Sequence, residues 1–253
     1  MQLRYRLALP LAAICCLAFA VAPALAAKPA PTPITQADGS TQPPVAEITS
    51  SAAACALGTF GPPINAFGYI LPPGDEYYTL IDPRQCPTCP PSGYHVTLSH
   101  QLLYFTDPCQ MQVTVSIVPA FENTPGCFTP NPFAPPLCQP VTYQINDGGV
   151  LGQCVDYQLP ISAGCCITGP VFLLIEFDSG TCAPGRPAFC GPAACVNCFQ
   201  YNYYPGAPFP GDDVCAVLSP QGVYGTIMSV DTECCAATPT LPGSWGMLKT
   251  LYR

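Results

Sequence analysis

Apolar and polar residues alternate along several short stretches of this chain with a period of two. In residues 111–117, four apolar side chains alternate with three polar ones, the pattern of a strand with one buried face. Residues 94–105 begin with the same alternation, and residues 141–145 repeat it. Residues 171–177 are apolar throughout, which is typical of a central strand covered on both faces.

Five further segments have strand character, and the chain contains no long amphipathic helical pattern. These segments are residues 77–81, 155–159, 214–218, 224–231 and 245–251. The 34 prolines and 21 glycines disfavour long helices and mark turns between the strands. About nine short strands with such loops predict an all-β fold, a two-sheet, jelly-roll-like β-sandwich formed by one disulfide-rich domain.

The beginning of the chain predicts export. Residues 1–26 read as a signal peptide, because Arg4 and Arg6 precede an apolar stretch that ends in small residues. That stretch is too short for a membrane span, so no span is expected after cleavage. Residues 27–54, rich in proline and threonine, are expected to be a disordered linker. Residues 55–253 are expected to form the folded domain.

Cysteine usage agrees with export. The chain has 18 cysteines, and 16 remain once Cys15 and Cys16 in the leader are removed. An even number in an exported chain predicts disulfides and a secreted, cell-surface or periplasmic protein. The adjacent cysteines at 165–166 and 234–235 should each pair with a different partner. The cysteines expected in disulfides are Cys55, Cys86, Cys89, Cys109, Cys127, Cys138, Cys154, Cys165, Cys166, Cys182, Cys190, Cys195, Cys198, Cys215, Cys234 and Cys235.

Two Cys-x-x-Cys pairs offer an alternative to disulfides. Cys86 with Cys89, and Cys195 with Cys198, would supply the four thiolates of a tetrahedral zinc site. Export and the 12 other mature cysteines (16 minus these four) favour disulfide pairing for all of them.

The charge balance excludes some partners. The formal net charge is −8, and only Arg84 and Arg186 are basic between Lys28 and Lys249. A nucleic-acid-binding protein needs a lysine and arginine footprint against phosphates, and an anionic membrane surface makes a similar demand. Neither is an expected partner.

An aromatic segment over residues 199–209 suggests a binding surface. Exposed tyrosine rings and amide side chains together suit sugar stacking or a protein partner. The expected function is therefore a secreted, non-catalytic binding or adhesion module, with a glycan as the first candidate ligand and an extracellular protein surface as the second. The expected ligand-binding residues are Tyr201, Asn202, Tyr203, Tyr204 and Phe209. In the other interpretation, these rings pack over the end of the sandwich.

Acidic residues in predicted loops suggest a calcium site. Carboxylates beside proline and glycine turns can combine with free carbonyl groups to bind Ca²⁺, although no EF-hand spacing occurs. No cofactor is required by this interpretation. The candidate calcium ligands are Asp75, Glu76, Asp212 and Asp213.

Two alternative functions stay open. A structural component of a cell-surface or extracellular assembly is favoured by the low charge, which would let bare strand edges associate with copies of the same chain. A hydrolase centred on Asp178 is the other, because residues 178–181 resemble the Asp-Ser/Thr-Gly loop of aspartic proteases. That resemblance implies two carboxylates sharing one proton, and this chain holds one copy of the loop.

The two histidines are predicted to lie on one strand. His95 and His100 are five residues apart, so their side chains should point to opposite faces and form no joint metal site. His100 should share the face of Val96 and Leu98 as a hydrogen-bonded histidine of the core.

Overall fold

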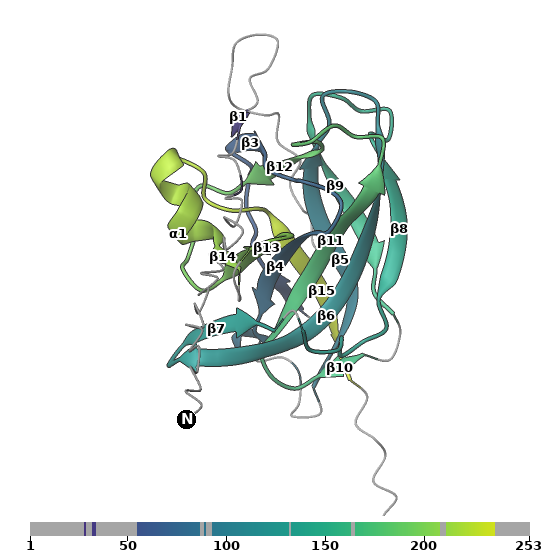
Figure 1. Ribbon diagram of the computed structural model, residues 1–253. Helices are drawn as coiled ribbons and strands as arrows, with labels where there is room; N and C mark the ends of the chain where they lie inside the picture. Colours follow the sequence, from purple (N-terminus) through teal and green to yellow (C-terminus); the bar gives the residue numbers. More distant parts are fainter. Residues whose placement is uncertain are drawn as a thin grey trace, which may run out of the picture.

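Two antiparallel sheets pack face to face in the computed structural model (Figure 1). The structure describes Lys28 and residues 32–33, 55–86, 89, 93–131, 133–162, 165–207 and 211–235. The predicted all-β sandwich is confirmed. The predicted leader, most of the linker, Phe209 and the predicted strand at 245–251 lie outside the described residues.

The eight-stranded sheet has β5 (Tyr94–Tyr104) near its centre. Along its main path the order is β1 (Thr32–Pro33), β3 (Asn65–Gly68), β12 (Ala188–Gly191), β5, β15 (Met228–Cys234) and β2 (Cys55–Gly58). The additional strands β9 (Cys154–Pro160) and β10 (Cys166–Ile167) also pair with β5.

The seven-stranded sheet is built around β11. Its order is β14 (Asp212–Asp213), β13 (Gln200–Tyr203), β4 (Asp75–Ile81), β11 (Val171–Gly180), β6 (Gln110–Thr124) and β7 (Cys127–Pro130), and β8 (Val141–Asn146) also pairs with β6. The short helical segments are η1 (Pro83–Gln85), α1 (Val214–Leu218) and η2 (Ser219–Gln221).

The core lies between the sheets, where the alternation in the sequence places it. Met111 and Val113 of β6 face the eight-stranded sheet, as do Leu173 and Ile175 of β11, and all four are buried. On the other face of β11, Phe172 is buried in a second cluster. The start of β11 is therefore covered on both faces, as its continuous apolar sequence predicts.

Two of the predicted strands differ from the structure. Residues 214–218 form α1, because the Asp213 carboxylate caps the first turn by accepting hydrogen bonds from the backbone N–H groups of Cys215 and Ala216. The strand predicted over residues 224–231 begins only at Met228. Among the described residues, no helix is both long enough and apolar enough to cross a membrane.

A β-bulge in β5 changes the face on which its side chains lie. The register with β15 shifts at Thr97. Val96 and Leu103 both belong to the cluster between the sheets, whereas Leu102 lies in a separate cluster. His100 shares the face of Leu102, so the prediction that it shares the face of Val96 is wrong. The shift also removes the reason for placing the two histidines on opposite faces. His100 is nevertheless buried and hydrogen-bonded, as expected.

All 16 cysteines from Cys55 to Cys235 form disulfides, which confirms their predicted role and disfavours the zinc alternative, because all four cysteines of that site are paired. The adjacent cysteines do pair with different partners, as expected. The disulfides are Cys55–Cys86, Cys89–Cys234, Cys109–Cys182, Cys127–Cys198, Cys138–Cys165, Cys154–Cys190, Cys166–Cys235 and Cys195–Cys215. So many disulfides indicate an oxidising environment.

Candidate functional site

The ammonium group of Lys28 is buried against the folded domain. Its Nζ lies 2.7 and 2.9 Å from the two carboxylate oxygens of Asp75. It also lies 2.8 Å from the hydroxyl of Tyr77 and 2.8 Å from the amide oxygen of Asn202. The Lys28 side chain is 1% exposed and that of Asp75 is fully buried. A charge so far from water is tolerated only with close partners of this kind.

Aromatic rings complete the enclosure. The Lys28 ammonium lies 3.9 Å from the ring centroid of Tyr69, 4.9 Å from that of Tyr77 and 5.5 Å from that of Tyr204. Contacts of this kind attract a cation to the ring face. We call the enclosing residues the Lys28 cage; they are Tyr69, Asp75, Tyr77, Asn202 and Tyr204.

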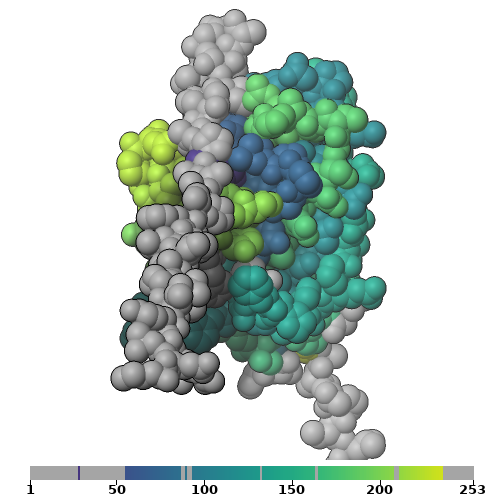
Figure 2. All heavy atoms as spheres, in the orientation of Figure 1, coloured from purple at the N-terminus to yellow at the C-terminus, as the bar shows by residue number. Residues whose placement is uncertain are grey.

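Pairing between β4 and β13 assembles the cage from distant parts of the chain. Asn202 lies opposite Tyr77 in the ladder, and its amide donates a 2.8 Å hydrogen bond to Asp75. The backbone N–H of Leu71 donates a second, at 2.7 Å, to the same carboxylate. Asp75 is therefore held by the domain independently of the lysine. In the space-filling view, blue atoms from the early part of the domain adjoin green atoms from its later part (Figure 2).

Burial weakens the basicity of the enclosed lysine. Desolvation lowers the pKa of Lys28 from 10.5 to about 8, although the negative charges of Asp75 and Asp212 act in the opposite direction. Burial also raises the pKa values of the Tyr69 and Tyr77 hydroxyls, which stay protonated. Lys28 therefore stays mainly an ammonium near neutral pH, but it gives up its proton more readily than an exposed lysine.

A second contact holds the segment that carries Lys28. The strand β1 pairs antiparallel with β3, with Thr32 opposite Gly68 and Pro33 opposite Phe67. This strand adds to the edge of the eight-stranded sheet, close in sequence to Tyr69 of the cage. Lys28 and β1 both fall within the segment predicted to be a linker.

The predicted ligand-binding residues divide between two faces of the seven-stranded sheet. Asn202 and Tyr204 belong to the Lys28 cage. Tyr201 is buried on the opposite face, with its ring centroid 5.8 Å from that of Phe172. Tyr203 is half-buried there, and its ring lies 6.4 Å from that of Phe133. Residues 200–203 of this segment form β13, and the described rings of residues 199–204 are buried or half-buried.

The four candidate calcium ligands do not converge. Asp75 pairs with Lys28, and Asp212 accepts a 3.4 Å hydrogen bond from the Tyr204 hydroxyl beside the cage. Glu76 accepts a hydrogen bond from the hydroxyl of Tyr78, which lies two residues later on the same strand. Within the described ranges, no group of three or more His, Cys, Asp or Glu side chains could hold a metal ion.

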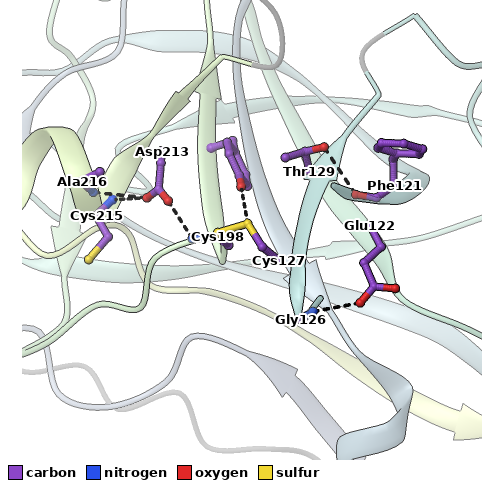
Figure 3. Close-up of a disulfide and its surroundings, with 10 residues drawn as sticks. Phe121, Glu122, Gly126, Cys127, Thr129, Cys198, Asp213, Cys215 and Ala216 are labelled. Carbon is purple, nitrogen blue, oxygen red and sulfur yellow. Dashed lines mark hydrogen bonds between the residues drawn. A yellow bond between two sulfur atoms is a disulfide. The ribbon is translucent and has the colours of Figure 1, made fainter. Parts of the chain in front are cut away.

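The fourth candidate ligand, Asp213, stabilises a turn and a helix. Its Oδ1 caps α1, as described above, and its Oδ2 accepts a 2.6 Å hydrogen bond from the backbone N–H of Cys198 (Figure 3). Cys198 has a left-handed backbone with φ of 62°, a conformation that costs energy for any residue with a Cβ. The Asp213 hydrogen bond and the disulfide to Cys127 hold this turn (Figure 3).

Asp178, the centre of the hydrolase alternative, lies on β11. It accepts a 3.3 Å hydrogen bond from the Gln112 amide. Glu176, two residues earlier on the same strand, lies opposite Glu76 of β4. The pKa of Glu176 is raised, first by burial and then by the charge of Asp178.

Sequence reasoning identified Asp75, Asn202 and Tyr204 but assigned them to different ligands, and it missed Lys28 altogether. One signal for Lys28 was available, since it is the only basic residue between Arg6 and Arg84. Nothing along the chain shows that a linker lysine and two distant strands meet.

No protein-family model, curated protein or solved structure matches this chain.

Proposed function

We propose that this protein is a non-catalytic extracellular assembly module that binds an extended, lysine-bearing segment. In this structure the segment is the chain's own, and in an assembly it comes from a neighbouring copy. The observation that carries the proposal is the buried ammonium of Lys28 in a cage that the folded domain provides.

Two features support capture of a segment. The chain pairs with the β3 edge through β1, a form of strand addition in which main-chain hydrogen bonds supply affinity. The cage then supplies specificity, because a side chain without a terminal amine would remove the hydrogen bonds that Asp75 and the Asn202 oxygen accept from Nζ. Residues 34–54 lie between the segment and the domain in the sequence, and a chain of that length spans at most about 70 Å when fully extended, which is enough to connect neighbouring copies.

The geometry favours a peptide over a glycan as the ligand. Sugar stacking requires exposed aromatic faces, whereas Tyr201 and Tyr204 are buried. The amide of Asn202 is fully buried and hydrogen-bonded to Asp75 and to the backbone oxygen of Glu76.

Peptide binding tests the proposal. In a full-length acceptor variant, residues 28–33 are replaced by glycine and serine, which leaves the cage and the β3 edge open. An N-acetylated peptide of residues 27–36 should bind to it, as measured by calorimetry. The same peptide with norleucine in place of Lys28 should bind about tenfold more weakly or worse, because a buried hydrogen bond to a charged group is lost. Equal affinity for the two peptides would contradict the role of the cage.

Complementation tests donation between copies. A donor variant, Asn202→Ala, keeps the segment but has a damaged cage, whereas the acceptor variant keeps the cage but lacks the segment. Native mass spectrometry should show a one-to-one heterodimer only when the two are mixed. A mixture that stays monomeric would restrict the segment to its own domain and overturn the assembly proposal.

A further inference from the structure

The Lys28 cage places an amine, a carboxamide and a carboxylate in mutual contact, and we propose that Lys28 and Asn202 join in an isopeptide bond with Asp75 as the acid–base group. This inference deepens the proposed function, because the bond would make capture of the segment permanent. It rests on the same site and is tested separately.

The three groups have the contacts that the reaction needs. The Lys28 Nζ lies 2.8 Å from the Asn202 Oδ1, which brings the nucleophile next to the carboxamide carbon. Asp75 contacts both reacting groups, because its Oδ2 lies 2.7 Å from Nζ and its Oδ1 accepts a 2.8 Å hydrogen bond from the Asn202 Nδ2. One carboxylate thus touches the nitrogen that attacks and the nitrogen that leaves.

The surroundings favour bond formation over hydrolysis. Asp75 and Asn202 are fully buried, and Tyr77 and the Lys28 side chain are each 1% exposed, so water has little access. An amine attacks only in its neutral form, and burial lowers the pKa of Lys28 to about 8. If the pair served stability alone, a lowered lysine pKa would be a disadvantage, whereas a nucleophile requires it.

The proposed reaction balances without a co-reactant. Asp75 takes a proton from the Lys28 ammonium, and the lone pair of the neutral Nζ forms a bond to Cγ of Asn202 while the carbonyl electrons move to Oδ1. Asp75 then gives its proton to Nδ2, the Cγ–Nδ2 bond breaks, and the carbonyl forms again as ammonia leaves. The surplus proton on Nζ passes to the ammonia, which departs as ammonium. Asp75 is again a carboxylate, and the product is a secondary amide.

Trypsin offers a direct test on the full chain. Lys28 and Arg186 precede prolines, where trypsin does not cut, so cleavage after Arg84 separates Lys28 from Asn202 in the reduced protein. With the isopeptide bond, the two fragments should stay joined under reducing, denaturing conditions. The mass of the joined species should also be about 17 Da less than the summed masses of the two separate fragments, since one ammonia is lost when the bond forms. Two separate fragments from the wild type would overturn the inference.

Variants assign the roles. Lys28→Arg and Asn202→Ala remove the nucleophile and the acceptor, and Asp75→Asn removes the acid–base group while keeping its size. All three should give separate fragments, whereas the matched control Asp178→Asn, on β11 outside the cage, should stay joined. A joined product from Asp75→Asn would overturn the role of Asp75. The wild-type digest decides the bond itself even where a variant folds poorly.

The two proposals fail in different ways. Separate wild-type fragments together with Lys28-dependent peptide binding would reject the bond and keep segment capture. A joined wild-type product without peptide binding to the acceptor variant would keep the bond and reject capture from a neighbouring copy.

Discussion

Individual buried polar side chains in this protein are held by partners from strands that are far apart in the sequence. The Gln200 amide donates hydrogen bonds of 2.7 Å to the backbone oxygen of Thr226 and of 3.0 Å to the Thr79 hydroxyl, and its oxygen accepts one of 2.9 Å from the Thr226 N–H. His100 lies between two carboxylates, with Nδ1 2.8 Å from Asp156 and Nε2 3.4 Å from Asp231. Such residues link the strands chemically as well as by packing.

His100 gives the fold a predictable pH dependence. Burial by itself would lower its pKa, but the hydrogen bond and charge of Asp156 and the charge of Asp231 raise it above 6.5 in the folded protein. A raised pKa means that the folded state binds the proton of His100 more tightly than the unfolded state does. The protonated imidazole therefore stabilises the fold fully at a pH below the pKa of His100 in the unfolded chain. This stabilisation is lost as the pH rises through the pKa of His100 in the folded protein.

We therefore expect the unfolding free energy of the wild type to fall as the pH rises across this window. The decrease should be larger than the one measured for a His100→Gln variant. Urea denaturation between about pH 5 and pH 9 measures both curves. Ser229 and Gln158 lie opposite His100 on the neighbouring strands and carry no charge, so the two carboxylates dominate. Parallel curves for the two proteins would contradict the assignment.

At the scale of elements, regular alternation was enough to find most of the longer strands. The β6 and β11 predictions are confirmed because each buries a continuous apolar face. Short elements were harder to predict. The five residues of α1 carry no helical period, and the sequence signal was only a capping residue, Asp213. The bulge at Thr97 depends on pairing with β15 and has no signature within β5.

Removal of the α1 cap should destabilise the domain measurably. Asp213→Ala loses the cap to Cys215 and Ala216 and the hydrogen bond to the strained Cys198, so we expect a loss of about 1–2 kcal/mol in chemical denaturation. Asp213→Asn is the matched control. Its oxygen can still cap the helix, but its NH₂ group cannot accept from Cys198, so its loss should be intermediate. An unchanged midpoint for Asp213→Ala would show that the cap contributes nothing.

At the scale of the whole molecule, disulfides and apolar burial take the place of ion pairs. Charged residues make up only 9% of the chain, and the Arg84–Asp82 pair is mostly exposed on the arginine side, where such pairs contribute little. Eight disulfides join segments up to 145 residues apart and restrict the unfolded chain.

Reduction should therefore raise the intact mass by about 16 Da and unfold the domain at room temperature, because several constraints disappear together. Mass spectrometry and circular dichroism on the same sample measure the two effects. A smaller mass gain would mean free thiols and would contradict the complete pairing. Retained β structure after full reduction would show that the core alone stabilises the fold.

The sequence by itself determined the period-two strands, the sandwich architecture and the pairing of every cysteine from Cys55 onward with another, because alternation and redox chemistry are local or compositional properties. It also marked Asp75, Asn202 and Tyr204 as chemically capable residues. Only the tertiary structure decided which cysteines pair and that these three residues surround Lys28. The physical reason is that β4 and β13 are joined by ladder hydrogen bonds across more than a hundred residues, and a contact set by strand order leaves no periodic trace in the chain.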